Sequence, residues 1–363
     1  MARTIAVASQ KGGCGKTTIA INLAASLALR NENVLLIDLD PQGHTSLGLG
    51  VDIENLEAGM YDVMATKDNG SSSIENTICH LNSKLDLAPT NVSLCAIEQM
   101  LAGKEGREFH LKKQLKHISE LYNYIIIDCP PSLGLLTFNA LLAADELIIP
   151  VESSLYSFQG VGKLLETLAL LKEELGHTLD YYILFSMFEG RTKFSRELLD
   201  KTINTYGDHV LNTKINYTIK LKEAANKGKP ITSYRSKRSR AFKDFFNLAC
   251  EIENLKILTK ISNIKLDVAD FQLPLKMTNG IYFAIQNKNA SNVHVVGNFN
   301  NWKANEESRL RSDGFGGWRK FIGLQPGSRY HYKYLVDGEW VEDHNNPRRE
   351  PSPYGGFNSI IEI

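Results

Sequence analysis

The most constraining feature of the sequence is a glycine-rich segment that directly follows its first apolar run. Residues 4–8 predict a buried strand, residues 10–18 read Gln-Lys-Gly-Gly-Cys-Gly-Lys-Thr-Thr, and an apolar helical pattern follows over Ile19–Leu29. Such a turn lets backbone N–H groups point at a phosphate, and the helix N-terminus favours the same negative charge. The segment therefore predicts a phosphate-binding loop inside an α/β fold.

The loop carries a lysine near each end. Lys16 is placed to reach the β and γ phosphates of a nucleotide, and the Thr17 hydroxyl is placed to ligate Mg²⁺. Lys11 stands two glycines away from the rest of the loop, so its side chain could stabilise a transferring phosphoryl group bound to a second subunit. We expect the nucleotide to be held by Lys11, Gly12, Gly13, Cys14, Gly15, Lys16, Thr17 and Thr18.

The pattern departs from two common phosphate-binding motifs. Gln10 stands where G-x-x-x-x-G-K-[ST] begins with glycine, and Thr18 stands where a dinucleotide-binding loop has its third glycine. The lysine–threonine pair favours a nucleoside triphosphate over a dinucleotide.

Carboxylates follow two later apolar runs. Asp38 and Asp40 end the run that begins at Val34, and Asp128 ends Tyr124–Asp128. Because ligands of open α/β sheets lie beyond the carboxyl ends of the strands, we expect all three carboxylates near the phosphates. We assign Asp128 and Asp38 to the Mg²⁺ shell together with Thr17, and Asp40 to the attacking water; any one aspartate could instead be a turn or cap residue.

Two domains of different class follow from the strand pattern. Up to residue 256, strand-like runs such as Glu146–Val151 and Tyr182–Met187 alternate with helix-length segments, which indicates a mostly parallel sheet. Residues 278–363 show short alternating runs separated by Gly, Asn, Asp and Pro, typical of an all-β immunoglobulin-like sandwich. We therefore expect a P-loop ATPase domain over 1–256, a linker over 257–277, and a sandwich over 278–363.

Composition limits the environment. The chain has 41 basic and 41 acidic residues, and its five cysteines are scattered without a C-x-x-C pair, which predicts no zinc site. No run approaches the length of a membrane span, and the first residues lack a signal-peptide layout. We expect a cytoplasmic protein that does not bind membranes.

The overall neutrality hides a basic stretch. Residues 214–243 contain ten basic residues against one acid, a net charge of +9. Such a run can be a solvated face or a surface for nucleic-acid phosphates, which would give salt-dependent affinity without sequence preference. For DNA contact we select Lys220, Lys222, Arg238 and Arg240.

Aromatic residues gather in the sandwich. Residues 277–363 hold 13 of the 32 aromatic residues and all three tryptophans. Aromatic rings beside amide and ammonium groups suit a sugar ligand, whereas aromatics of a sandwich more commonly form its core, as we expect for Phe283, Phe299 and Phe321. We expect Trp318 to be structural, and we find no carboxylate pair that suggests glycoside hydrolysis.

The motifs of the first 255 residues resemble one family. K-G-G-C-G-K-T-T, L-I-D-L-D-P-Q-G-H and I-I-D-C-P-P-S resemble the deviant Walker A, switch I and switch II motifs of ParA/Soj partition ATPases. The resemblance implies an ATP- and Mg²⁺-dependent dimer that hydrolyses ATP, binds DNA non-specifically at the nucleoid and is activated by a ParB-like protein. It also implies that Lys11 acts in trans and that Asp40 is catalytic, together with Lys16.

This chain departs from the family at two segments, and one of them is Tyr234-Arg235-Ser236, where a base replaces the acid of the family's Y-D-P. The family's I-P-R-N-V-R-L reads Ile215–Leu221 here without its proline and an expected arginine, which leaves base contacts from this segment open.

The last 84 residues resemble a second family. G-N-F-N-N-W, Y-K-Y-L-V-D-G-E-W and F-N-S-I-I-E-I resemble the glycogen-binding domain of the AMP-activated kinase beta subunit and isoamylase-type modules. That resemblance implies α-glucan contacts from Trp302, Lys333, Trp340 and Asn358. Tyr354 and Gly356 replace a leucine and a threonine of that domain.

Together these patterns predict a partition ATPase that positions a cargo, which is either plasmid or chromosome DNA or a glycan-associated cargo held by the C-terminal domain. Two alternatives stay open: a sandwich that binds protein instead of glycan, and a regulatory ATPase that binds α-glucan without contacting DNA.

Overall fold

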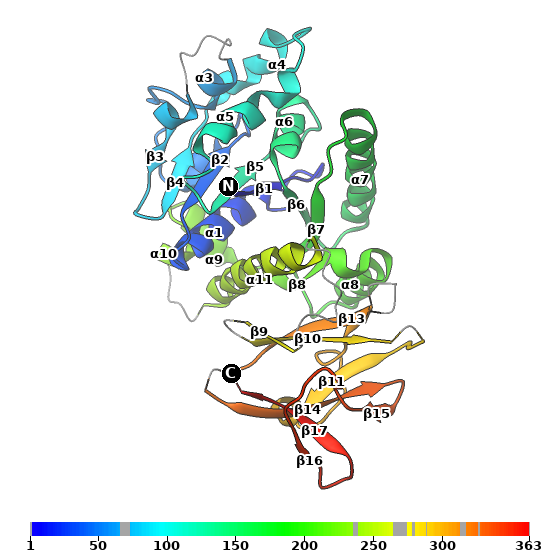
Figure 1. The fold of residues 1–363 in the computed structure, drawn as a ribbon. Coiled ribbons are helices and arrows are strands. Elements are labelled where there is room, and N and C mark those ends of the chain that lie inside the picture. Colours follow the sequence, from blue (N-terminus) through cyan, green and yellow to red (C-terminus); the bar gives the residue numbers. More distant parts are fainter. Residues whose placement is uncertain are drawn as a thin grey trace. The chain divides into compact units, whose positions relative to one another are not determined.

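The protein forms two compact units, Met1–Glu253 and Asn254–Ile363, in the computed structural model (Figure 1). The structure describes residues 2–65, 73–234, 239–263, 274–277, 280–287, 289–312, 317–325 and 327–362.

The first unit is built on a sheet of eight described strands in the order β3-β4-β2-β5-β1-β6-β7-β8. Only β3 runs antiparallel to its neighbour β4, and the other pairs are parallel. The strands are β1 Arg3–Val7, β2 Val34–Asp38, β3 Cys79–His80, β4 Leu85–Ala88, β5 Tyr124–Asp128, β6 Glu146–Val151, β7 Asp180–Phe188 and β8 Val210–Asn216. This arrangement confirms the predicted P-loop-type α/β class.

Helices lie on both faces of this sheet (Figure 1). The central strands β1, β2 and β5 are buried along their whole length, which explains why they read as continuous apolar runs and not as alternating patterns. The helices are α1 Lys16–Leu29, α2 His44–Gly48, α3 Met60–Ala65, α4 Ile97–Met100, α5 His110–Ile118, α6 Leu135–Ala143, α7 Leu155–Leu175, α8 Lys193–Tyr206, α9 Ile219–Ala225, α10 Ile231–Tyr234 and α11 Arg240–Asn263.

Strand order brings the predicted carboxylates to one edge. The register pairs Asp128 at the end of β5 with Val7 at the end of β1 on one side and with Asp38 at the end of β2 on the other. The phosphate loop leaves β1 at this same edge, so the loop and both carboxylates meet although they lie far apart in sequence.

The sequence predicted β1, β2, β5, β6 and β7 and missed strands at both sides of the sheet. β2, β5 and β6 have the predicted bounds, whereas β7 extends beyond 182–187 and β4 and β8 were not predicted. β4 is only four residues long, and the polar residues of β8 (Val-Leu-Asn-Thr-Lys-Ile-Asn) obscure its strand pattern because β8 lies at the edge of the sheet.

The second unit contains two antiparallel sheets. One has the order β12-β13-β10-β9; the other has the order β11-β14-β17-β16, with β15 paired to β14. Their bounds are β9 Leu275–Met277, β10 Gly280–Gln286, β11 Val293–Gly297, β12 Arg311–Ser312, β13 Gly317–Gly323, β14 Arg329–Val336, β15 Glu339–Val341, β16 Arg349–Pro351 and β17 Phe357–Glu362.

The two sheets share one core. Phe283 from β10 meets Tyr332 from β14 edge to face at 4.9 Å between ring centroids, and both rings are fully buried. The Tyr334 hydroxyl donates to the Ala284 carbonyl of the other sheet at 3.0 Å. This packing confirms the all-β class that the alternating runs predicted.

The division between the units falls within α11, between Glu253 and Asn254. The linker that we expect over 257–277 overlaps the end of this helix, and its central part, 264–273, lies outside the described residues. The boundaries 1–256 and 278–363 therefore remain our proposal.

Candidate nucleotide site and two candidate binding surfaces

The phosphate loop has the backbone of an anion site. Gly13 and Gly15 have φ of 78° and 87°, a left-handed conformation that favours glycine, and Gly15 caps α1 without a side-chain hydrogen bond. A Cβ atom at Gly12 or Gly13 would meet no atom within 4 Å. The first N–H groups of α1 thus have no side-chain cap, and the space over the loop is open for phosphate oxygens.

Neighbouring residues hold the loop in shape. The Cys14 thiol is fully buried and donates to the Lys11 carbonyl at 3.2 Å, while the Ser186 hydroxyl of β7 donates to the Cys14 carbonyl at 2.7 Å. Cys14 therefore contributes backbone to the site and not its sulfur atom. The Thr18 carbonyl accepts from the Asn22 amide at 2.8 Å within α1.

Lys16 lies inside the loop it serves. Lys16 is the first residue of α1 and is only 7% exposed. Its Nζ donates to the Lys11 carbonyl at 3.4 Å. A buried ammonium bonded to a carbonyl is suited to exchange that contact for a phosphate oxygen.

Asp128 is the carboxylate nearest in register to the loop strand. It is fully buried, its Oδ2 accepts from the Thr45 hydroxyl at 2.7 Å, and its Oδ1 has no hydrogen-bond partner among the described residues. Burial raises the pKa of this carboxyl to about 6, although the Thr45 hydroxyl opposes the shift. A buried acceptor without a partner beside a phosphate loop fits a site for hydrated Mg²⁺.

Asp38 lies one strand further from the loop. Its Oδ2 accepts from the backbone N–H and the hydroxyl of Ser46 at 2.9 and 2.7 Å. Burial, and next the charge of Asp128, raise the pKa of Asp38 to about 8. A divalent cation would stabilise both ionised carboxylates.

Among the described residues, no cluster of three or more His, Cys, Asp and Glu side chains could hold a metal by itself. Mg²⁺ commonly binds through few carboxylates together with water and substrate phosphates. One hydroxyl and two carboxylates, from Thr17, Asp38 and Asp128, match this type of coordination. Their assignment as metal ligands stays a prediction.

Asp40 faces the site from the turn after β2. Its Oδ1 accepts from the Gln42 N–H at 3.0 Å, and the residue is 8% exposed. The Asp40 N–H also donates to Asp38 Oδ1 at 3.4 Å, which places Asp40 beside the second carboxylate of the site.

Lys11 has partners within its own chain. Its Nζ forms an ion pair with Glu152, which follows β6, and donates to the Ser154 hydroxyl at 3.0 Å. The sequence reasoning missed Glu152 and Ser154, together with Thr45 and Ser46. Glu152 and Ser154 are polar residues just beyond β6, whereas Thr45 and Ser46 lie in α2 and carry no such local signal.

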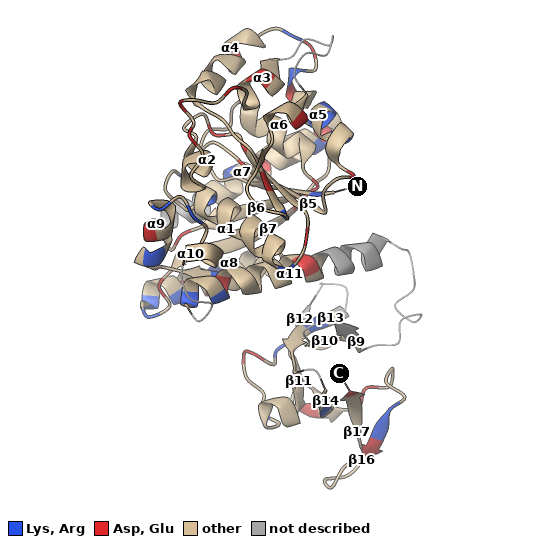
Figure 2. Cartoon of the chain, turned by 90° about the vertical axis from the view of Figure 1, so that its left-hand side faces the viewer, with Lys and Arg blue, Asp and Glu red and all other residues tan. Residues whose placement is uncertain are grey.

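The basic surface is only partly described. Lys220 and Lys222 are exposed on α9, and Arg240 is exposed at the start of α11, where its Nη2 donates to Asn216 Oδ1 at 2.6 Å. Figure 2 shows several ribbon segments in the Lys and Arg colour on α9 and at the beginning of α11. Arg238 lies outside the described residues. The structure thus brings three of the four selected cations to neighbouring helix ends.

The candidate glycan residues lie together on the second unit. The rings of Trp302 and Trp340 are 6.2 Å apart between centroids, and Trp340 is 55% exposed. Lys333 on β14 donates to the Gly355 carbonyl at 3.2 Å, and Asn358 lies on the neighbouring strand β17. Lys333 and Asn358 are each 8% exposed, so both residues are largely buried, whereas Trp340 is open to solvent.

Trp318 is buried, as we expected for a structural residue, and its Nε1 donates to the Asn287 carbonyl at 3.1 Å. Phe283 is fully buried and Phe299 is packed against the same core.

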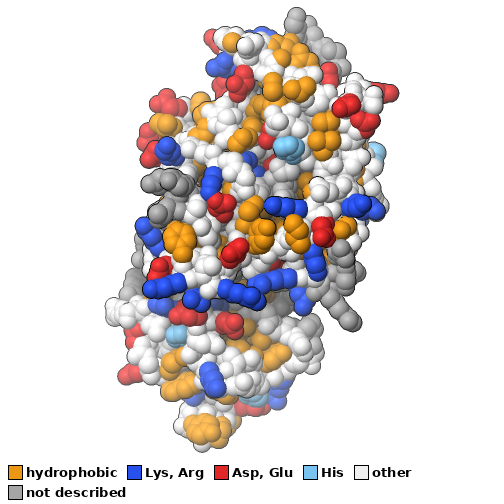
Figure 3. Space-filling model, turned by 180° about the vertical axis from the view of Figure 1, so that it is seen from behind, with side chains coloured by type: hydrophobic (Ala, Val, Ile, Leu, Met, Phe, Trp, Pro, Cys, Tyr) orange, Lys and Arg blue, Asp and Glu red, His pale blue; other side chains and the backbone are white. Residues whose placement is uncertain are grey.

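No described helix is long and apolar enough to cross a bilayer. Figure 3 shows that hydrophobic side chains on one face occur in small groups between charged ones. Over the described residues visible there, this face has no continuous apolar surface.

Comparisons with known proteins match both units. Residues 2–181 match the family described as AAA domain, and residues 283–363 match the glycogen recognition site of AMP-activated protein kinase. The sporulation initiation inhibitor protein Soj of Bacillus subtilis is 38% identical over 253 residues, which are 69% of this chain and 98% of that protein. The chromosome-partitioning ATPase Soj of Treponema pallidum is 39% identical over 255 residues, 69% of this chain and 97% of that protein.

Among solved structures, cobyrinic acid a,c-diamide synthase from Mycobacterium smegmatis, with a bound ATP analog and magnesium, is similar with a TM-score of 0.61 and 29% identity. The match covers 73% of this chain and 98% of the synthase.

Proposed function

The chain belongs to the ParA/Soj family of ATPases, and from this premise we propose that it is a DNA-binding partition ATPase that positions a glycan-associated cargo. It hydrolyses ATP with Mg²⁺, and it carries a C-terminal domain of the glycogen-recognition family. We propose in addition that it forms a dimer, binds DNA and binds a glycan, with a role for each site residue.

The phosphate loop binds the triphosphate. Backbone N–H groups of Gly12–Gly15 and the N-terminus of α1 bind phosphate oxygens, and Lys16 exchanges the Lys11 carbonyl for a phosphate. Thr17, Asp38 and Asp128 hold Mg²⁺, which neutralises phosphate charge when bound. Asp40 orients the attacking water from the turn after β2, where Gln42 fixes its carboxylate.

Lys11 completes the site of a second subunit. In that dimer the ammonium leaves Glu152 and stabilises the negative charge that develops on the transferring phosphoryl group. Hydrolysis is therefore coupled to dimerisation, and a ParB-like partner accelerates it. Loss of the γ-phosphate lets the dimer separate.

The exposed cations on α9 and α11 supply the DNA surface. Lys220, Lys222 and Arg240, together with Arg238, neutralise backbone phosphates without reading bases. Electrophoretic shift of an arbitrary duplex tests this role. We expect a shift with ATP that weakens at high salt; no shift under any condition would favour a regulatory ATPase that does not contact DNA.

The paired tryptophans Trp302 and Trp340 are the observation that supports glycan binding. Two indole rings 6.2 Å apart can stack on the apolar faces of sugar rings, while Lys333 and Asn358 bond the hydroxyl groups. Retention on amylose or glycogen resin tests it: Trp302→Ala and Trp340→Ala should abolish retention. An unretained wild-type chain would favour a protein-binding sandwich.

A further inference from the structure

The outward face of β14 continues beyond the candidate glycan residues. Tyr332 and Tyr334 point into the sandwich core, so Lys333 and His331 lie on the opposite face. The register pairs Leu335 with Trp340 and His331 with Ile360, and Lys333 is next to Asn358 by extension of the same antiparallel pairing. Along β14, the position next to Trp340 therefore comes first, Lys333 beside Asn358 follows, and His331 comes last.

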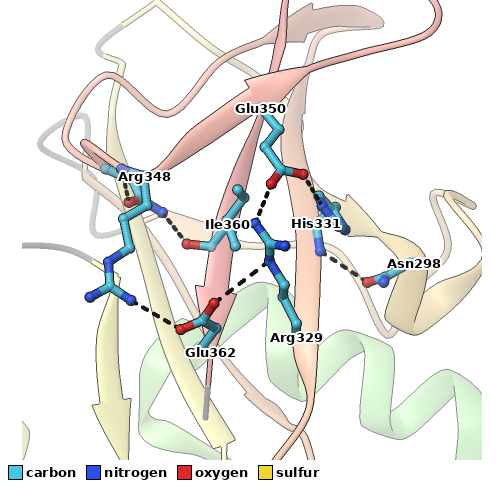
Figure 4. Close-up of polar contacts among 8 residues, drawn as sticks. Asn298, Arg329, His331, Arg348, Glu350, Ile360 and Glu362 are labelled. Atoms are coloured by element: carbon cyan, nitrogen blue, oxygen red, sulfur yellow. Dashed lines mark hydrogen bonds and ion pairs between the residues drawn. The ribbon is translucent and has the colours of Figure 1, made fainter.

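A polar network occupies the next positions on that face (Figure 4). His331 Nε2 lies 3.1 Å from Glu350 Oε2, and Glu350 also pairs with Arg329. Arg329 lies 3.6 Å from Glu362, which Arg348 approaches at 3.4 Å. We call Arg329, His331, Arg348, Glu350 and Glu362 the distal network.

The distal network is both accessible and ordered by its own contacts. The side chains of Arg329 and Glu350 are 48% and 43% exposed, and that of His331 is 30% exposed. Asn298 Oδ1 accepts from the His331 N–H at 3.1 Å on one side, and β16 supplies Glu350 on the other. Donors and acceptors are therefore held in place while solvent still reaches them.

The charges of the distal network compensate one another. Two arginines face two glutamates, so the network has no excess charge to attract an anion. It presents guanidinium donors beside carboxylate acceptors, and a neutral polyhydroxyl ligand can use both because each hydroxyl donates and accepts. This chemistry fits further sugar units better than a phosphate or an acidic chain.

We propose that the distal network is a second glycan subsite that binds the continuation of an α-glucan chain held by Trp302 and Trp340. The inference rests on the proposed glycan binding of this domain. A chain that contacts the tryptophans and then Lys333 and Asn358 runs along β14, and His331 lies two residues further, a step of about 7 Å. Long chains reach the distal network and short ones do not.

Calorimetric titration of the full-length protein with maltotriose and maltoheptaose tests this subsite. We expect the wild type to bind maltoheptaose more tightly. Glu350→Gln and His331→Ala should each weaken maltoheptaose binding about fivefold, the loss expected for one or two hydrogen bonds, and leave maltotriose binding unchanged. Arg319→Ala, an exposed position on the β13 sheet, is the matched control and should change neither affinity.

The outcomes separate the two ideas. Equal affinity of the wild type for both sugars, or unchanged maltoheptaose binding in Glu350→Gln and His331→Ala, would overturn the second subsite and leave the tryptophan site intact. Equal losses for both sugars would also overturn it, because they indicate damage to the whole surface. A wild type that binds neither sugar contradicts glycan binding itself.

Discussion

The ammonium group of Lys11 lies against the carboxylate of Glu152, and Ser154 accepts a hydrogen bond from the same ammonium at 3.0 Å. Lys11 belongs to the phosphate loop after β1, whereas Glu152 follows the neighbouring strand β6. The side chain is thus bound within its own subunit and has to exchange these partners before it can act on a nucleotide in another one.

Mixing two inactive variants tests the trans role of Lys11. Lys11→Ala and Asp40→Ala should each bind ATP and fail to hydrolyse it. In a mixed dimer, the Lys11→Ala subunit keeps Asp40 and receives Lys11 from its partner, so one site is complete. An equimolar mixture should regain about a quarter of wild-type turnover, because half of the dimers are mixed and each has one working site.

The control for the mixture is each variant alone at the same total concentration, together with Lys193→Ala, which removes an exposed lysine paired with Glu197 on α8. No regained turnover in the mixture, with both variants binding ATP, would place the action of Lys11 in its own subunit.

The salt dependence of DNA binding tests the basic surface. Lys220→Ala and Lys222→Ala should each weaken binding to all sequences alike and lower the slope of log affinity against log salt by about one, because each removes one phosphate contact. Lys193→Ala should leave the slope unchanged. An unaltered slope in both α9 variants would move the DNA surface elsewhere.

The close approach of two glycines predicts a large loss of stability. A Cβ atom at Gly228 would lie 2.7 Å from the Cα atom of Gly50, and Gly228 has a φ of +60°. Gly228→Ala should lower the free energy of unfolding by about 3 kcal/mol, from backbone strain plus displacement of the neighbouring turn.

Gly103→Ala separates the two causes. Gly103 has a φ of +72°, but a Cβ atom added there would meet no atom within 4 Å, so this variant should lose only about 1 kcal/mol. Thermal melts of both variants measure the difference, and equal losses would show that strain alone accounts for the Gly228 effect.

The pH dependence of stability should report His177. Its Nε2 lies 3.0 Å from the Leu141 carbonyl, and burial, followed by the charge of Lys112, holds the pKa of this imidazole below its usual value. The unfolded state therefore takes up a proton near pH 6.5 while the folded state does not, so stability falls as pH drops through this range.

His177→Gln should lower the melting temperature slightly at pH 8 and reduce its fall between pH 7 and pH 5 by about 1–2 °C. His117→Gln, which replaces a histidine on α5, is the comparison. The same fall in wild type and His177→Gln would exclude His177 as the responsible group.

The central strands and the phosphate loop could be predicted because their signals are local. A run such as Tyr-Ile-Ile-Ile-Asp identifies β5 without reference to any other part of the chain, and the loop glycines allow backbone conformations that other residues disfavour. The strands β4 and β8 escaped prediction because one is very short and the other carries polar residues at the sheet edge.

The partners of the site residues could not be predicted. Nothing in the sequence joins Thr45 to Asp128, Ser46 to Asp38 or Lys11 to Glu152, since each contact depends on which strands become neighbours. Similarly, the Trp302–Trp340 pair and the distal network follow from the antiparallel register of β14.

The sequence by itself determined the two fold classes, the phosphate loop and the residue types available for chemistry, because glycine conformations and apolar periodicity act over a few neighbouring residues. The tertiary structure alone decided that one carboxylate oxygen of Asp128 lacks a hydrogen-bond partner within the described part of the chain, that Glu152 binds Lys11, and that a charge-balanced network lies beyond Lys333. The physical reason is that burial and pairing depend on contacts between residues distant in sequence, which exist only when the strands have assembled.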